Sequence, residues 1–260
     1  MIKQKLSLLA AIFGLMATTT VQPPLAKTAE LSEIKQRGKL IVAVKDNVRP
    51  LGFSDEKGNL VGLEIDLARR LAKELLGNAD AVVLKPVSNK ERLQAVLGDK
   101  ADIAIARVTA TIPRSRIVDF SPYYYLDGTG IITKNKLIDN KENLATAKIA
   151  VLYDSTTIAV IRHELPNAQL IGVKSYQEAL NLLEANKVTA FAGDLTILTG
   201  WIQEYPQYQL LPDRLSGEPL SIVMPKGIQY ADLRKQVREA ILSWRKSGWL
   251  QERIQYWGLP

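Results

Sequence analysis

The side chains that could do chemistry in this chain stand in loops at the ends of predicted strands. Arg114 lies in the loop after the apolar run 101–106, and Asp194 follows a glycine at the end of the run 189–192. An arginine can clamp a carboxylate through two N–H donors, and an acid can hold an ammonium group. Each also has a plainer interpretation, because a loop arginine is commonly solvated or paired with an acid such as Asp119, and an acid after glycine commonly caps a helix.

Metal and cofactor chemistry has little support in the sequence. His163 is the only histidine, and with Glu164 beside it and no cysteine in the chain, neither a zinc site nor a Ser-His-Asp triad can be assembled. Gly128 and Gly130 do not form a phosphate-binding loop, because the strand-to-helix context and the lysine are missing. We therefore expect no metal site and no cofactor.

Composition limits the class of protein. The 260 residues are 47% hydrophobic, enough for two modest domains or one large one with a sizeable core. The formal net charge is +7, but three lysines and no acid precede Glu30, so the rest of the chain is closer to neutral. Basic residues form neither a run nor a stripe interleaved with aromatic residues. We expect no nucleic-acid partner.

Residues 1–26 are predicted to be a secretory signal peptide. Lys3 and Lys5 give a positive start, residues 6–17 form a short apolar run, and small or polar residues follow to Ala26. The apolar run is too short for a comfortable membrane span. We expect cleavage after Ala26, with an uncleaved anchor as the alternative, and a soluble exported protein.

Strands that alternate with helices predict α/β units with mostly parallel sheets. Residues 40–44 form a β-branched run typical of a buried parallel strand, and the loop 46–53 follows at its carboxyl end, where open α/β sheets hold ligands. Residues 62–75 predict a helix, since their apolar side chains recur at spacings of three and four. Further strands are expected at 81–84, 101–106, 148–152, 169–173, 189–192 and 220–224, and further helices at 31–37, 89–97, 175–185 and within 231–256.

Five motifs, in order along the chain, resemble one family. They are DEKGNLVG, GLEIDLARRLAKEL, DKADIAIA, IPRSRIVDFSPYYY and the closing SGWLQERIQYWG. Together they resemble the periplasmic polar-amino-acid-binding proteins of ABC importers, the bacterial extracellular solute-binding proteins of family 3. The resemblance covers nearly everything from about Gly38 to the C-terminus.

This resemblance implies a two-lobe fold of the type II periplasmic-binding-protein kind. Each lobe would be a mostly parallel sheet flanked by helices, and two crossing strands would join the lobes. Lobe 1 is expected to be discontinuous, formed by residues 30–124 and 223–260, and lobe 2 to span 129–218. The hinge crossings would then fall at 125–128 and 219–222.

The resemblance also assigns roles in holding a free amino acid. Arg114 corresponds to the arginine that clamps the α-carboxylate, and Thr109 to a threonine that adds a hydroxyl and backbone donors. Asp194, from the second lobe, would hold the α-amino group. Thr156 and Thr157 would supply donors at a helix N-terminus, which favours a carboxylate.

Departures from the family pattern bear on the ligand. Arg49 and Arg107 are extra cations near the predicted pocket, and they would suit a ligand with a second negative group, such as glutamate or aspartate. Alternatively they point outward or pair with Asp46 and Asp127. Asp46 itself argues against an acidic ligand, because relatives use an acid there to hold cationic or amide side chains.

The leading interpretation is a periplasmic receptor, not an enzyme, that captures a polar and possibly acidic L-amino acid by hinge closure. It would act as a monomer and deliver its ligand to an ABC permease in the inner membrane. One alternative is an enzyme resembling the periplasmic cyclohexadienyl or arogenate dehydratases, for which Glu64 and Glu218 are the candidate acids. The other is a ligand-sensing module.

Overall fold

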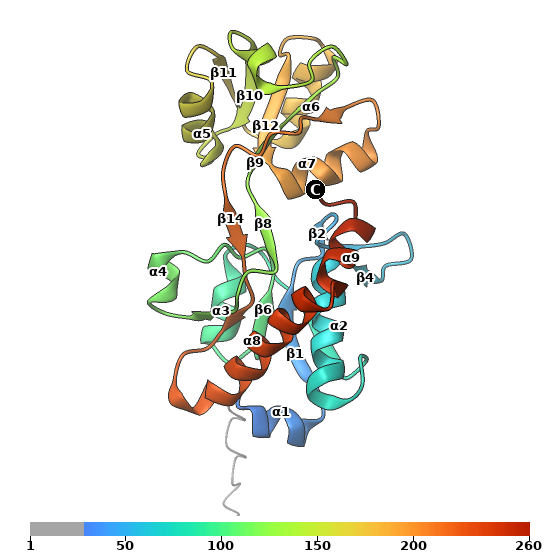
Figure 1. Cartoon of the computed structure of the whole chain (residues 1–260), viewed down its shortest axis with the longest axis vertical. Helices are drawn as coiled ribbons and strands as arrows, with labels where there is room; N and C mark the ends of the chain where they lie inside the picture. Colours follow the sequence, from blue (N-terminus) through green and yellow to red (C-terminus); the bar gives the residue numbers. More distant parts are fainter. Residues whose placement is uncertain (1–28) are drawn as a thin grey trace, which may run out of the picture.

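The computed structural model describes residues 29–260 of the chain, so the predicted signal peptide at 1–26 lies outside the described residues. Two lobes lie along the long axis of the molecule, joined by two strands (Figure 1). Each lobe holds a five-stranded sheet with helices packed against it. The expected two-lobe α/β fold is confirmed.

The sheet of lobe 1 has three parallel strands and, at one side, the short strands β15 and β7, each antiparallel to the strand before it in the sheet. Its order is β5-β1-β6-β15-β7. The register places Val42 opposite Ile103, and four of the five residues of β1 are buried, as its continuous apolar run predicts. The strands are β1 (Leu40–Val44), β5 (Val82–Pro86), β6 (Ile103–Ile105), β7 (Asp119–Phe120) and β15 (Val223–Met224).

Helices enclose this sheet and complete the lobe 1 core. The predicted apolar stripe of α2 is buried, and so is the first-turn acid Glu64. Trp244 of α8 is fully buried, and its indole Nε1 donates to Glu74 at 2.6 Å. Among residues 29–260, no helix is both long and apolar enough to cross a bilayer. The helices are α1 (Leu31–Arg37), α2 (Leu63–Leu76), α3 (Glu91–Leu97), α4 (Ile112–Ser115), η2 (Ile228–Tyr230), α8 (Ala231–Lys246) and α9 (Trp249–Tyr256).

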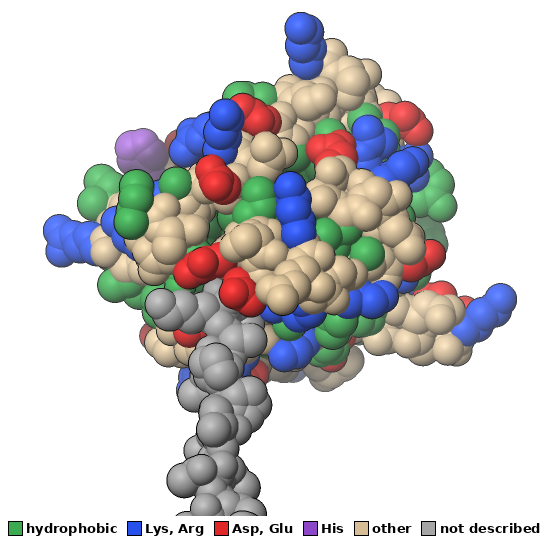
Figure 2. Space-filling model, turned by 90° about the horizontal axis from the view of Figure 1, so that it is seen from below, with side chains coloured by type: hydrophobic (Ala, Val, Ile, Leu, Met, Phe, Trp, Pro, Cys, Tyr) green, Lys and Arg blue, Asp and Glu red, His purple; other side chains and the backbone are tan. Residues whose placement is uncertain are grey.

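A small antiparallel sheet follows β1 and carries the first loop of lobe 1. It consists of β2 (Asn47–Val48), β3 (Gly52–Ser54) and β4 (Leu60–Val61), joined by the predicted turn at 55–59. Figure 2 shows the lobe 1 end of the molecule, where basic and acidic side chains are interspersed.

Lobe 2 repeats the same architecture with the order β11-β10-β12-β9-β13. Adjacent residues of one strand enter different core clusters: Ile131 packs on one face of the sheet and Ile132 on the other. Both faces are therefore covered, as a central apolar strand requires. The elements are β9 (Thr129–Thr133), η1 (Lys141–Leu144), β10 (Lys148–Leu152), α5 (Thr157–Glu164), β11 (Gln169–Val173), α6 (Tyr176–Glu184), β12 (Ala190–Asp194), α7 (Leu195–Glu204) and β13 (Gln209–Leu210).

Two antiparallel strands, β8 (Tyr125–Asp127) and β14 (Glu218–Leu220), run side by side between the lobes (Figure 1). The prediction of one continuous strand at 220–224 is wrong, because this segment pairs first with a crossing strand and then with the lobe 1 sheet. Leu220 pairs with the crossing strand β8, whereas Val223 pairs with Ala104 and Phe120 in the lobe 1 sheet.

Candidate functional site

The predicted site residues lie just beyond the carboxyl ends of four strands. In lobe 1, β1 and β6 are adjacent and parallel, and the loops that follow them carry Asp46 and Arg107. In lobe 2, β10 and β12 are adjacent and parallel, and they lead to Thr156 and Asp194. This is the edge at which open α/β sheets bind ligands.

Arg114 is half-buried in the short helix α4 and is oriented by its own loop. Its Nη1 donates to the carbonyl of Thr109 at 2.8 Å. The local acid Asp119 pairs instead with Arg234, whose Nε lies 3.1 Å from its carboxylate. The structure therefore brings Arg114 and Thr109 together.

The loop after β6 is fastened to the crossing strand β14. The amide of Ala110 donates to the carbonyl of Pro219 at 2.9 Å, and Thr109 forms a β-bridge with Leu220. The amide of Ser221 donates to Val108 at 3.0 Å. A movement of this crossing strand would therefore be transmitted directly to the loop that carries Thr109.

The backbone of Arg107 is held in lobe 1 by two side chains. It has φ 51°, in the left-handed region that non-glycine residues seldom adopt. Its amide donates to Glu64 Oε1 at 2.6 Å, and its carbonyl accepts a hydrogen bond from the guanidinium of Arg92. These two hydrogen bonds therefore fix the position of the Arg107 backbone, from which its side chain extends.

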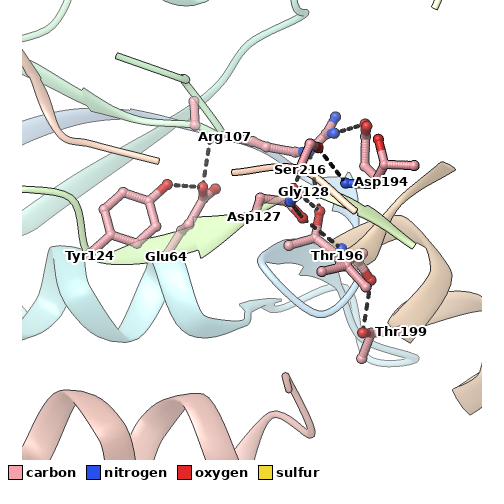
Figure 3. A network of polar contacts seen from close by, with 12 residues as sticks. Glu64, Arg107, Tyr124, Asp127, Gly128, Asp194, Thr196, Thr199 and Ser216 are labelled. Carbon is pink, nitrogen blue, oxygen red and sulfur yellow. Dashed lines mark hydrogen bonds and ion pairs between the residues drawn. The ribbon is translucent and has the colours of Figure 1, made fainter. Parts of the chain in front are cut away.

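The Arg107 side chain reaches from lobe 1 to lobe 2 (Figure 3). Its Nη2 donates to Asp194, and its Nε lies 3.3 Å from Thr196 Oγ1 and 3.7 Å from Asp127 Oδ2. Arg107 thus faces the acids of lobe 2 and the crossing strand. The alternative in which Arg107 pairs with Asp127 is met by the 3.7 Å approach, but the hydrogen bond of the guanidinium goes to Asp194.

Asp194 occupies the N-cap position of α7, but its side chain does not cap the helix. That role belongs to the buried Asp127 of β8, whose Oδ1 accepts from the amides of Gly128 at 2.9 Å and Thr196 at 3.1 Å. Its Oδ2 accepts from Thr196 Oγ1 at 2.7 Å (Figure 3). Since Asp127 does the capping, Asp194 is left facing lobe 1, where it meets Arg107.

Arg92 is a cation of this site that sequence reasoning missed. Its Nη1 also donates to the carbonyl of Ala106 at 3.1 Å. Burial, assisted by the nearby charges of Arg114 and Arg107, lowers the pKa of Arg92 to about 10. The sequence contained one signal for this role. A positive charge in the first turn of a helix is unfavourable next to the helix dipole, which indicates that Arg92 has a partner elsewhere.

Glu64, a candidate acid of the dehydratase alternative, lies in the first turn of α2 and is completely buried. Its Oε1 accepts from Tyr124 Oη at 2.5 Å and from the Arg107 amide, while Oε2 has no hydrogen-bond partner among the described residues (Figure 3). Burial raises the pKa of Glu64, although both hydrogen bonds act in the opposite direction. The role of Glu64 here is to position the backbone of Arg107.

The raised pKa of Glu64 makes stability depend on pH. An acid whose pKa is higher in the folded than in the unfolded chain binds more protons when folded, so stability is lost as pH rises from about 4.5 through the raised pKa. We expect the wild type to lose free energy of unfolding over this range relative to Glu64→Gln, measured by urea unfolding at several pH values. The exposed Glu56→Gln serves as control. Parallel pH profiles for wild type and Glu64→Gln would contradict the assignment.

Thr156 and Thr157 lie at the start of α5, at the carboxyl end of β10. Thr156 is exposed and Thr157 is buried. Because β10 pairs with β12, this helix start is one strand away from Asp194. Within residues 29–260, no hydrogen bond connects either threonine to Arg114 or Thr109, the two residues predicted to bind the ligand carboxylate from lobe 1.

Asp46 and Arg49 line a separate cavity of about 440 Å³ between the β2–β3 loop and helices α6 and α7. Arg49 lies over the ring of Phe53, 3.9 Å from its centroid, and its Nε is 3.8 Å from a carboxylate oxygen of Glu204. The partner of Arg49 is therefore an acid of lobe 2 rather than Asp46. Tyr176 also lines this cavity, and burial raises its pKa, while the charge of Arg107 acts in the opposite direction.

Helix α7 touches lobe 1 beside this cavity. A Cβ on Gly200 would lie 2.5 Å from the carbonyl oxygen of Arg49, so no larger residue fits at this approach of the two lobes. Further along the helix, Gln203 Nε2 donates to the carbonyl of Trp257 at 2.9 Å. In the part of the chain that the structure describes, no group of His, Cys, Asp and Glu side chains is placed to hold a metal ion.

Two α/β lobes joined by a pair of crossing strands, with charged loops meeting between them, define a type II periplasmic binding protein. The chain belongs to the bacterial extracellular solute-binding proteins, family 3, whose model matches residues 40–260.

Similar proteins agree with this membership. A glutamine-binding protein of Geobacillus stearothermophilus is 32% identical over 200 residues, covering 76% of each chain. The ABC transporter glutamine-binding protein GlnH of Bacillus subtilis is 29% identical over 235 residues, covering 89% of this chain and 85% of its own. Among solved structures, an ancestral cationic amino acid solute-binding protein superposes with a TM-score of 0.75 at 27% identity, covering 87% of this chain and 98% of its own.

One relative is an enzyme, but the match is partial. A cyclohexadienyl dehydratase of Pseudomonas aeruginosa is 30% identical over 123 residues, which is 47% of this chain and 44% of its own. Binding proteins match this chain over much longer stretches. Extracellular solute-binding proteins of family 3 work with the permeases of ABC transporters, and membership places this chain among binding proteins rather than enzymes.

Proposed function

We propose that this protein captures a polar L-amino acid between its two lobes and delivers it to an ABC permease. The observation that carries the proposal is the contact between Arg107 of lobe 1 and Asp194 of lobe 2, since it brings the loop that carries Arg114 opposite an acid. A free amino acid presents one carboxylate and one ammonium group. Arg114, oriented by Thr109, would bind the first, and Asp194 would bind the second.

Hinge closure would complete the site. We assign residues 30–124 and 223–260 to lobe 1, residues 129–218 to lobe 2, and the hinge to 125–128 and 219–222. Ligand would bind first to lobe 1, and closure would add Asp194 and the donors of Thr156 and Thr157. The β-bridge between Thr109 and Leu220 supports this coupling, because it connects the carboxylate-binding loop to the hinge.

The ligand's side chain would extend into the cavity beside Arg49 and Asp46. Polar groups and aromatic rings share its lining, which suits a polar side chain with an aliphatic stem. Two similar proteins are named for glutamine, which supports a neutral side chain of this length. Glutamate has the same length, and Arg49 and Arg107 would favour its second carboxylate.

The cellular setting follows from the family and the start of the sequence. Residues 1–26 would direct export and be removed, and the protein would then act as a monomer in the periplasm. Its partner would be the permease of an ABC transporter in the inner membrane.

Thermal shifts against all twenty L-amino acids test this function. The purified chain would be unfolded and refolded once to remove any ligand carried through purification. We expect a polar amino acid to raise the melting temperature, because a ligand that binds only the folded state stabilises it. If none of the twenty raises it, the proposal fails, and turnover of prephenate and arogenate would then test the dehydratase alternative.

A further inference from the structure

Arg107 brings a positive charge to the acid that the proposed function assigns to the ligand's ammonium group. The inference below rests on that function. The Arg107 side chain is 18% exposed and the Asp194 side chain 24% exposed, so neither is sealed from solvent. Glu64 and Arg92 hold the Arg107 backbone in place. The loop therefore cannot carry the side chain away from the site.

Two carboxylates contact this guanidinium, and a third is paired across the strands with one of them. Asp194 accepts its hydrogen bond, and Asp127 lies 3.7 Å from its Nε. Glu218 is paired opposite Asp127 across the two crossing strands, and its pKa is raised by burial and by the charge of Asp127, while the charge of Arg107 acts in the opposite direction. Arg107 therefore offsets part of the negative charge of these acids.

The acids are not equally free to bind a ligand. Both oxygens of Asp127 already accept hydrogen bonds from the start of α7 and from Gly128. Asp194 makes no hydrogen bond to cap that helix and faces the guanidinium. An arriving ammonium group would therefore bind Asp194 and stand directly beside Arg107.

We propose that Arg107 is a specificity-determining residue that excludes amino acids with a cationic side chain. The neighbouring cavity begins beside Arg107 along α7, because Thr196, 3.3 Å from Arg107 Nε, directly precedes Ile197, which lines the cavity. A ligand bound to Asp194 that extends its side chain into this cavity therefore places the side chain next to Arg107. A side-chain cation would meet the guanidinium within a few ångströms, in addition to the ligand's own ammonium group. Repulsion between like charges at such distances, partly shielded from water, is enough to weaken binding about tenfold or more. Neutral and acidic side chains escape this repulsion.

Titration calorimetry with L-glutamine, L-glutamate and L-arginine tests the proposal. The proteins are the wild type, Arg107→Ser, Arg107→Lys and the control Arg116→Ser, which removes an exposed arginine nine residues further on. We expect Arg107→Ser to improve the affinity for arginine relative to glutamine by about tenfold or more. Arg107→Lys keeps the charge and should keep the wild-type ratio within about threefold, as should Arg116→Ser.

Several outcomes would overturn the inference. An unchanged arginine-to-glutamine ratio in Arg107→Ser would do so, as would an equal change in Arg116→Ser. If Arg107→Ser does not fold, Arg107→Gln removes the charge at nearly the same size and gives the same readout. A wild type that binds no amino acid overturns the proposed function together with the inference, whereas wild-type binding with an unmoved ratio in the variants overturns the inference alone.

Discussion

Replacing Arg114 with alanine should weaken amino-acid binding by about 100-fold, the largest effect on binding that we expect from a single residue. The variant loses two charge-assisted hydrogen bonds to the ligand carboxylate and leaves that charge without a partner, a loss of about 3 kcal/mol. Among residues 29–260, the side chain makes one hydrogen bond, to the carbonyl of Thr109, so the fold should survive. Calorimetric titration of the refolded chain measures the loss.

Arg116→Ala is the matched control for this prediction. It removes an arginine of the same loop whose side chain is exposed, at the C-terminal end of α4. Affinity should stay within about twofold of the wild type. If Arg114→Ala binds as tightly as Arg116→Ala while both remain folded, then Arg114 does not hold the ligand.

Asp127→Ala should lower the free energy of unfolding by about 3–5 kcal/mol, the largest effect on stability that we expect. The carboxylate is fully buried and accepts three hydrogen bonds, from the Gly128 amide, the Thr196 amide and the Thr196 hydroxyl. Without it, these donors are buried unsatisfied and α7 loses its cap. Urea unfolding followed by circular dichroism measures the change.

Asp127→Asn separates hydrogen bonding from charge. The amide oxygen can still accept from both backbone donors, and its NH₂ group can donate to the Thr196 hydroxyl, so we expect a loss of about 1 kcal/mol. A loss below about 1 kcal/mol for Asp127→Ala itself would show that the start of α7 is not held by this residue.

Much of the fold could be predicted from local pattern. The apolar stripe of α2 and the β-branched run of β1 each gave the right element, because each buries a periodic set of side chains against the core. Strands β7, β9 and β13, which pair antiparallel with their neighbours, were not predicted. A Cβ on Gly130 of β9 would lie 2.4 Å from Cδ2 of Leu195, so this glycine lets α7 pack closely on the strand.

The candidate site was harder to predict, because its contacts join residues far apart in the chain. Arg114 and Thr109 are five residues apart, and their contact follows from the loop itself. Arg107 and Asp194, by contrast, are 87 residues apart and meet only because two sheets present their carboxyl ends to each other. Periodicity cannot show which of several acids a guanidinium will meet. The environment of Glu64 was missed for the same reason, since Tyr124 is 60 residues away.

Helix α7 makes its contacts with lobe 1 along one face. Thr196 lies beside Arg107, Gly200 lies against the backbone of Arg49, and Gln203 binds the carbonyl of Trp257. These positions follow helical spacings of four and three, within a segment of ten residues that starts directly after Asp194. Recombination that exchanged this one segment between relatives would change the residues that contact lobe 1 and so the way the lobes meet, whereas Asp194 precedes the segment and would be kept. The contacts between the lobes could thus change in evolution by a single genetic event.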